Sequence, residues 1–377
     1  MDVRVAVAGG GINGAGVAWE LARKGYDVSL FERGEFGGET SSATTKLIHG
    51  GLRYLEHLQF GLVHESLRER AFLLERLPSL VKPIEIIIPW YGTSPRPFWV
   101  VQSGLVLYDA LAGGKGLGRH RVITRDEVLR SVSIRAEGLR GGFLFSDGQT
   151  DDRELVQTVI RSAERDGVRL CERTAVESVR PVDDGWVVVT GGSEQRFDLL
   201  VVVLGPWMNE FLERNRIATA VRLSLIRGSH LVLRRRMGER GVLLQSADDR
   251  RVLFALPWKG KTMVGTTEVE QNDLGRIEPS EEEIDYLIRR FNRYFDVPAT
   301  RDEIVETFAG VRPLIGRKRD PRAISRDSTI EAEGRLVKVF GGKMTTFLAL
   351  ARRVGRRADR LLGESRTARP PQFDTSR

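Results

Sequence analysis

The segment at residues 41–57 reads SSATTKLIHGGLRYLEH and combines hydroxyl, basic, aromatic and glycine residues in a short span. Hydroxyl side chains come first, and His49, Arg53 and Tyr54 follow them. Hydroxyl groups hydrogen-bond to phosphates and sugars, histidine exchanges protons near neutral pH, and the arginine fork suits anionic groups such as phosphate. A plain surface loop needs no such mixture, so the segment indicates ligand binding.

A glycine motif lies near the start of the chain. Gly9, Gly11 and Gly14 follow an apolar strand pattern and precede a helical pattern over 13–24, and Glu32 ends the next apolar run. Glycines permit a tight turn and a close approach of backbone N–H groups to a pyrophosphate at the helix N-terminus. A carboxylate at the end of the second strand accepts hydrogen bonds from ribose hydroxyls. The pattern predicts a dinucleotide site.

Two later stretches favour FAD over NAD. FDLLVVVLGPW brings a buried strand to Gly205, where bare backbone can lie against a cofactor, and FGGKMTTF opens a late helix behind Gly341 and Gly342. The N-terminus of that helix suits the pyrimidine end of a flavin, where negative charge forms on reduction. A nicotinamide enzyme has no evident use for this helix start. FAD is therefore the predicted cofactor, and no metal site is expected.

The elements that must position these residues predict an α/β protein with two domains. Residues 3–31 read as strand, helix and strand, the βαβ unit of a doubly wound, Rossmann-type sheet. Short β runs separated by turns over 221–270 predict an antiparallel sheet in a second, substrate domain. The expected boundaries are 1–80, 145–215 and 306–365 for the FAD domain, 81–144 and 216–305 for the substrate domain, and 366–377 for a loose tail.

Composition restricts the class of protein. Cys171 is the only cysteine, which excludes an internal disulfide and an all-cysteine metal site and suits a cytoplasmic protein. We expect no secretory signal, and no apolar run reaches the ~18 residues of a transmembrane helix. The net charge of +8 comes from scattered arginines without interleaved aromatic residues, so no nucleic-acid partner is expected.

With these features together, the chain resembles the FAD-dependent glycerol-3-phosphate dehydrogenase family, in particular its quinone-linked bacterial members. The resemblance extends from Val3 to about Arg360 and is carried by GGGINGAG, TSSATTKLIHGGLRYLEH, DGQTDDREL, GPW, IRGSHLVL, PWKGKTMVGTTEVE, FAGVRPL, ISRDS and VFGGKMTTF. It implies a doubly wound FAD domain beside an antiparallel substrate domain. It also implies oxidation of sn-glycerol 3-phosphate to dihydroxyacetone phosphate, with electrons passed to a membrane quinone.

The chain departs from the family pattern in two respects. The usual helical C-terminal domain is not expected here, which leaves open a homo-oligomer or a partner subunit in its place. Leu204, Met344 and Phe347 stand where the family often has Thr, Leu and Tyr.

The resemblance assigns the segment at 41–57 to both ligands. Residues 40–46 offer hydroxyls and amides to the FAD pyrophosphate and ribityl chain, and His49 with Gly50 reaches the isoalloxazine edge. The full set expected to bind FAD is Gly9, Gly11, Ile12, Asn13, Gly14, Glu32, Arg33, Thr40, Ser41, Ser42, Thr45, Lys46, Leu47, His49, Gly50, Val176, Gly205, Trp207, Gly342, Met344 and Thr345.

Arginines are expected to hold the substrate phosphate, because a dianion favours bidentate donors. The residues expected at the substrate are Arg53, Tyr54, His230, Thr267, Arg312, Arg326 and Lys343. Oxidation at C2 also needs a base for the hydroxyl proton. His49 and Lys343 are the two favoured candidates, since a histidine titrates in the right range and positive neighbours lower a lysine pKa. His230 is a third candidate, although a lone histidine in a strand is more often structural, and Arg312 completes the expected catalytic set.

Four alternatives remain at this point. A glycerol-3-phosphate oxidase would use O2, and family oxidases often carry an insertion that is not evident here. An amino-acid or hydroxy-acid oxidase of the same fold would need one arginine for a carboxylate rather than several. A flavoprotein acting on RNA would need a clustered basic face, and a mere flavin-binding scaffold would not need the arginines and the base.

A quinone acceptor implies peripheral contact with the cytoplasmic face of a membrane. Trp90, Tyr91, Phe98 and Trp99 near Arg96 form the predicted interfacial patch. The arginine-rich last helix has an apolar stripe that is expected to pack on the FAD domain rather than on lipid; the stripe consists of Val354, Ala358 and Leu361.

Overall fold

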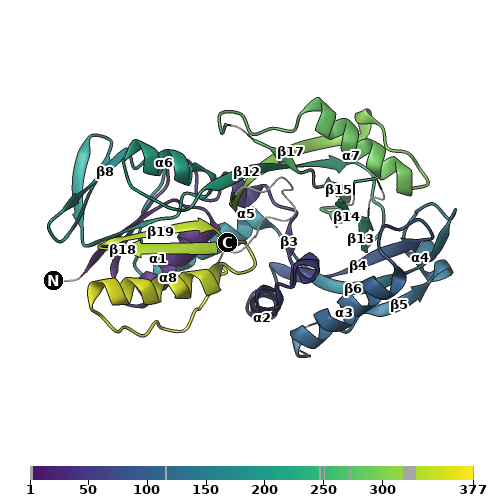
Figure 1. The fold of residues 1–377 in the computed structure, drawn as a ribbon, viewed down its shortest axis with the longest axis horizontal. Helices are drawn as coiled ribbons and strands as arrows, with labels where there is room; N and C mark the ends of the chain where they lie inside the picture. Colours follow the sequence, from purple (N-terminus) through teal and green to yellow (C-terminus); the bar gives the residue numbers. More distant parts are fainter. Residues whose placement is uncertain are drawn as a thin grey trace.

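The structure is a computed structural model that describes residues 3–114, 117–245, 248–249, 251–271, 273–316 and 328–376. It consists of two lobes, each built around one large sheet (Figure 1). The predicted fold class is confirmed: a mostly parallel sheet with helices lies beside a mostly antiparallel sheet.

The parallel-sheet lobe carries, within the described residues, a six-stranded sheet of order β18-β19-β11-β1-β2-β7. Neighbouring strands are parallel except β18 and β19. The strands are β1 (Arg4–Ala8), β2 (Asp27–Phe31), β7 (Arg169–Cys171), β11 (Leu199–Val202), β18 (Ser328–Glu333) and β19 (Leu336–Gly341). Val5 and Val7 of β1 are fully buried because both faces of this sheet are covered.

One face of this sheet packs against three helices, α1 (Ile12–Arg23), α5 (Asp152–Arg165) and α8 (Phe347–Leu362). The other face is covered by α6 (Met208–Arg214) and by a small antiparallel sheet of β8 (Ser178–Val182), β9 (Gly185–Thr190) and β10 (Ser193–Phe197). In the arginine-rich helix α8, Val354 and Ala358 are fully buried and Leu361 is half-buried in the helical layer. The apolar stripe therefore packs on the lobe, as expected.

The antiparallel-sheet lobe carries the second sheet, of order β16-β12-β15-β14-β13-β4-β6-β3, with β17 paired to β12 and β5 paired to β6 among the described strands. Its strands are β3 (Leu47–Ile48), β4 (Val81–Tyr91), β5 (Arg121–Thr124), β6 (Leu139–Thr150), β12 (Leu223–Leu233), β13 (Gly241–Gln245), β14 (Val252–Trp258), β15 (Lys261–Gly265), β16 (Val269–Glu270) and β17 (Ile304–Ile315). Its helices are α2 (Phe60–Arg76), α3 (Phe98–Ala112), α4 (Arg125–Ser131) and α7 (Glu281–Tyr294). Helix α7 begins with a capping box, in which the Ser280 and Glu283 side chains each accept from the other residue's backbone N–H.

Two expected boundaries differ in the structure. Strand β17 pairs along its length with β12, so 306–315 belong to the antiparallel sheet and not to the FAD domain. The tail is not loose: Phe373 packs on Trp19 at 5.0 Å between ring centroids, and the Arg369 N–H donates to the Arg23 carbonyl. An apolar ring and backbone donors give these last residues partners on α1.

The predicted interfacial patch is only partly at the surface. Trp99 is 68% exposed, whereas Tyr91 is buried and its hydroxyl donates to the Arg135 carbonyl. Trp90 and Phe98 pack edge to face, 5.4 Å apart, because each completes the apolar layer beside β6. Across the described helices, none combines the length and the apolar character that a membrane span requires.

Candidate active site

A cavity of about 460 Å3 lies where the two lobes meet. It is lined by the carboxyl ends of β1, β2, β11 and β19, by most of the residues between 37 and 54, and by strands of the antiparallel sheet. In open α/β sheets, ligands bind in the crevice beyond the carboxyl ends of the strands. The size lies within the range of small-molecule sites.

The glycine turn at the start of α1 lines one end of this cavity. Gly9 has φ +110°, and a Cβ there would lie 2.3 Å from the Val203 carbonyl oxygen. A Cβ on Gly14 would lie 1.8 Å from the Gly9 carbonyl oxygen. The turn therefore requires glycine at both positions, and it brings the N-terminus of α1 to the wall of the cavity.

Glu32 stands beside this turn, as expected. One carboxylate oxygen accepts from the Gly10 N–H at 2.8 Å, and the other accepts from the Gly34 N–H at 2.9 Å. The neighbouring Arg33 lies over the Trp207 ring at 4.1 Å and also lines the cavity. The backbone thus fixes the carboxylate at the mouth of the glycine turn, where a ribose is expected.

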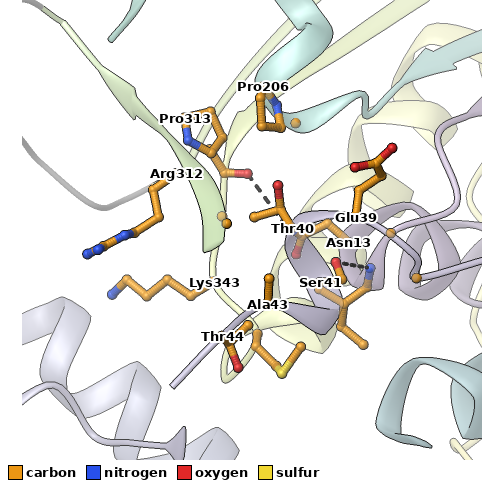
Figure 2. A pocket seen from close by; sticks show the side chains of 18 of the residues that line it. Asn13, Glu39, Thr40, Ser41, Ala43, Thr44, Pro206, Arg312, Pro313 and Lys343 are labelled. Carbon is orange, nitrogen blue, oxygen red and sulfur yellow. Dashed lines mark hydrogen bonds between the residues drawn. The ribbon is translucent and has the colours of Figure 1, made fainter. Parts of the chain in front are cut away.

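The loop at 40–46 is held in place by its own side chains. The Thr40 hydroxyl donates to the Val311 carbonyl at 3.0 Å, and the Ser41 hydroxyl accepts from the Ile12 N–H at 3.0 Å (Figure 2). Lys46 is buried, and its ammonium donates to Asp152 at 2.6 Å and to the Ser42 carbonyl at 2.7 Å. Lys46 does not line the cavity; it anchors the loop to the N-terminus of α5.

Most of the residues expected at FAD line the same cavity. They are Gly9, Gly11, Ile12, Asn13, Gly14, Glu32, Arg33, Thr40, Ser41, Thr45, Leu47, His49, Val176, Gly205, Trp207, Gly342, Met344 and Thr345. Ser42, Lys46 and Gly50 are not brought to it. The Ser42 hydroxyl turns back to the Gly38 carbonyl, and the Gly50 N–H is held by side chains of the antiparallel-sheet lobe.

Basic side chains from separate segments meet at the other end of the cavity. Arg53, Arg312 and Lys343 all line it, and in Figure 2 Arg312 and Lys343 point to the same side. Gly228 makes room for the Arg312 guanidinium, because a Cβ there would lie 2.1 Å from Nη2. The Lys343 ammonium lies 4.0 Å from the centre of the Tyr54 ring. This end of the cavity has the character of an anion site.

An acidic residue that the sequence analysis missed lies among these arginines. Glu268 is buried, and its Oε1 stands 3.8 Å from a guanidinium nitrogen of Arg53 and 3.8 Å from one of Arg312. Arg312 also donates to the Thr266 hydroxyl at 3.1 Å and to the Thr267 carbonyl at 2.9 Å. The turn at 265–268 thus fixes the arginine fork.

Thr267, expected at the substrate, points the other way. Its hydroxyl donates to Glu283 at 2.5 Å and accepts from the Ser229 N–H at 2.8 Å. Burial alone would raise the pKa of Glu283, but hydrogen bonds from Thr267 and Ser229, together with the charge of Arg227, lower it. Its neighbour Thr266 lines the cavity instead, because alternate residues of an extended segment face opposite sides.

His230 lines the cavity as a neutral imidazole. Burial, then the positive charges of Arg312 and Lys46, lower its pKa to about 3. The ring stacks on Phe308 at 4.9 Å, and its Nε2 lies 3.0 Å from the Thr45 hydroxyl. A histidine in this environment is neutral at neutral pH, and it is held by the Phe308 ring and the Thr45 hydroxyl.

The cavity also has an apolar wall that the sequence analysis did not identify. It is formed by Leu52, Phe145, Leu243, Val252 and Phe254. The order β14-β13-β4-β6 within one sheet brings together the wall residues that lie on β6, β13 and β14, and Leu52 joins them from the 52–57 segment. No local motif marks these residues. Arg326, a predicted substrate arginine, lies outside the described residues.

Comparison with known proteins shows which family the chain is similar to. The model of the FAD-dependent oxidoreductases matches residues 4–356. Glycerol-3-phosphate dehydrogenase of Pseudomonas aeruginosa is 39% identical over 92% of this chain and 70% of its own length. D-erythritol 1-phosphate dehydrogenase of Brucella abortus is 38% identical over 92% of this chain and 72% of its own length.

A solved structure shares the fold. Glycerol-3-phosphate dehydrogenase of Bacillus halodurans, determined with FAD, aligns with a TM-score of 0.78 at 24% identity. The alignment covers 99% of this chain and 68% of that one.

Proposed function

Because the chain belongs to the glycerol-3-phosphate dehydrogenase family of FAD-dependent oxidoreductases, we propose that it oxidises sn-glycerol 3-phosphate to dihydroxyacetone phosphate and passes the electrons to a quinone. The observation that carries this proposal is the meeting of Arg53, Arg312 and Lys343 at one end of a cavity whose other end is a glycine turn. Several fixed cations in one place suit a phosphate dianion better than a single carboxylate.

The residues of the glycine turn fit FAD, the cofactor of this family. Gly9 and Gly14 leave no room for side chains, α1 presents its N-terminus, and Glu32 is held at the ribose position. We assign the pyrophosphate to the start of α1 and the loop at 40–45, and the ring to the region between the 49–51 turn and the 342–345 turn. Bound FAD supplies the hydride acceptor.

The side chains at the other end bind and orient the substrate. Arg312 and Arg53 donate to the phosphate, and the turn at 265–268 keeps the Arg312 fork from swinging into solvent. Glu268 does not line the cavity itself, but it stands 3.8 Å from the guanidinium groups of Arg53 and Arg312 and its charge helps to hold both of them at the phosphate site. His49 and Lys343 are the two candidates to accept the C2 hydroxyl proton.

The quinone and membrane part of the proposal is supported by an exposed apolar surface on the second lobe. Leu58 is 73% exposed, Trp99 68% and Val106 52%. Leu58 directly follows η2 (Leu52–His57), and Trp99 and Val106 lie on α3, which packs on η2 and on α2. The η2 segment carries Arg53, so this surface adjoins the cavity. An acceptor held in a lipid interface would approach the site from here.

Anaerobic flavin bleaching tests the reaction. We expect the purified holoprotein to lose its yellow colour with sn-glycerol 3-phosphate and to keep it with glycerol. D-erythritol 1-phosphate serves as the four-carbon comparison, since it carries the same phosphate on a longer polyol. Equal bleaching by glycerol would remove the phosphate from the recognition argument, and faster bleaching by D-erythritol 1-phosphate would reassign the substrate.

A second measurement identifies the acceptor. We expect steady turnover with a soluble quinone under nitrogen and little peroxide in air. Peroxide formed at the rate of substrate oxidation, with the quinone inactive, would identify an oxidase instead.

A further inference from the structure

We propose that Asp147, Tyr108 and Arg70 form a positioning cluster that sets where the His49–Gly51 turn stands in the active-site cavity. The inference rests on the proposed function, because it gives His49 and its turn a place in the reaction. None of the three side chains belongs to the predicted site. They come from β6, α3 and α2, which are separate elements of the antiparallel-sheet lobe.

The cluster converges on one backbone N–H. The Gly50 N–H donates to the Tyr108 hydroxyl oxygen at 2.9 Å and to Asp147 Oδ1 at 3.1 Å. Asp147 Oδ1 also accepts from the Tyr108 hydroxyl at 2.8 Å and from Arg70 Nη1 at 2.5 Å. Arg70 donates in addition to the Ser146 carbonyl at 3.0 Å. A carboxylate with several fixed donors is held far more rigidly than one with a single donor.

Burial of these three polar side chains costs free energy of folding, so stability alone does not explain the cluster. Arg70, Tyr108 and Asp147 are 2%, 2% and 3% exposed. A buried ion pair generally contributes little net stability compared with apolar residues of the same volume, because both charges lose their hydration. Burial, followed by the charge of Asp147, raises the pKa of Tyr108 well above its ordinary value, so its hydroxyl remains a donor.

The turn that the cluster holds is shared between the two lobes. The His49 N–H donates to the Thr345 hydroxyl at 3.2 Å, on the parallel-sheet lobe. The next amide, that of Gly50, donates to the cluster on the other lobe. A Cβ on Gly50 would lie 2.3 Å from the Tyr108 hydroxyl, so the backbone presses directly against the cluster. The hydrogen bonds of these two adjacent amides thus fix His49 between the parallel-sheet lobe, which we assign to FAD, and the antiparallel-sheet lobe, which carries Arg53 and Arg312.

The experiment uses Tyr108→Phe, which removes one hydroxyl from the cluster. Tyr91→Phe is the matched control, because it removes the hydroxyl of another buried tyrosine, which donates to the Arg135 carbonyl away from the cavity. Anaerobic stopped-flow measurements of flavin reduction give a limiting rate and a half-saturating substrate concentration for each variant. The substrate is whichever phosphorylated alcohol bleaches the wild-type holoenzyme, so a wrong substrate assignment leaves this test intact.

We expect Tyr108→Phe to lower the limiting rate about 10-fold with half-saturation nearly unchanged, since loss of geometry acts on the reacting arrangement rather than on phosphate binding. Tyr91→Phe should match the wild type. In a His49→Gln background, Tyr108→Phe should have no further effect, because the cluster acts through the turn that carries His49.

Two outcomes would overturn the proposal: an unchanged limiting rate in Tyr108→Phe, or a full additional loss in the double variant. Flavin content per protein is measured for each sample. If Tyr108→Phe binds no flavin, Asp147→Asn takes its place, because it keeps the shape and an acceptor oxygen while weakening the hold on Gly50. The same cycle with His49→Gln then decides the question.

Discussion

The two ends of the active-site cavity are built in different ways. The cofactor end is made of backbone: two glycines, the N-terminus of α1 and a carboxylate fixed by two amides. The anion end is made of side chains, with Arg53, Arg312 and Lys343 delivered by segments far apart in the sequence. At the first end, a Cβ on Gly9 or Gly14 would collide with backbone atoms, whereas the second end depends on the neighbours that orient each charged side chain.

The backbone end predicts the largest effect. Gly14→Ala would place a Cβ 1.8 Å from the Gly9 carbonyl oxygen, so the turn must open and the N–H groups lose their alignment. We expect the purified variant to contain no FAD, measured as absorbance near 450 nm relative to protein. Gly61→Ala is the control, because a Cβ at this position of α2 has no heavy atom within 4 Å among the described residues. Full flavin content in Gly14→Ala would contradict the backbone argument.

The side-chain end predicts a smaller loss that leaves the flavin in place. Arg312→Ala removes a charge-assisted donor from the proposed phosphate site, and we expect kcat/KM to fall on the order of 10²-fold or more. Arg312→Lys should recover only part of this loss, because an ammonium keeps the charge but not the fork. An exposed arginine of β10 provides the control, Arg196→Ala. Unchanged kinetics in Arg312→Ala would mean that the phosphate binds elsewhere.

The smallest effect concerns the acid dependence of the protein's free energy of unfolding, to which His230 in the cavity contributes. The pKa of His230 is lowered to about 3 in the folded protein, against an ordinary value of 6.5. Between pH 6.5 and pH 3, His230 is protonated in the unfolded chain but neutral in the folded protein. The free energy of unfolding therefore decreases as the pH falls from 6.5 toward 3. At pH 5 this linkage amounts to roughly 2 kcal/mol.

His230→Gln removes the titrating ring and retains a polar side chain near Thr45. Thermal unfolding of the holoprotein should show a smaller decrease in Tm from pH 7 to pH 5 in this variant than in the wild type. His64→Gln alters an exposed histidine of α2 and serves as the comparison. An identical acid loss in all three proteins would show that His230 is not the group responsible.

What could be predicted from the sequence follows the same division. The βαβ unit, Glu32 and the late glycine turn are local patterns, and the structure places them together at the cofactor end. The prediction of the residues at the anion end rested on the family resemblance. It was wrong where only tertiary contacts decide which way a side chain points. Thr267 and Lys46 lie in the expected segments but point to Glu283 and Asp152 instead of the cavity.

Other features had no local signal at all. The pairing of β17 with β12 places Arg312 on the second sheet. The composition of this 12-residue strand does not indicate which strand it pairs with. Asp147, Tyr108 and Glu268 act through contacts between distant segments, so their spacing in the sequence is uninformative. The prediction of a loose tail at 366–377 is wrong for the described residues, because their partners on α1 are distant in the sequence and no local pattern indicates them.

The position of β19 in the parallel sheet has a consequence for folding. This strand pairs with β11 and leads into the 342–345 turn of the cavity, although the strands β12 to β17 of the other lobe lie between β11 and β19 in the sequence. Until β19 has docked, β11 is an open edge of the sheet and a template for pairing with other chains. A folding intermediate without docked β19 therefore lacks both the complete flavin cavity and a protected sheet edge.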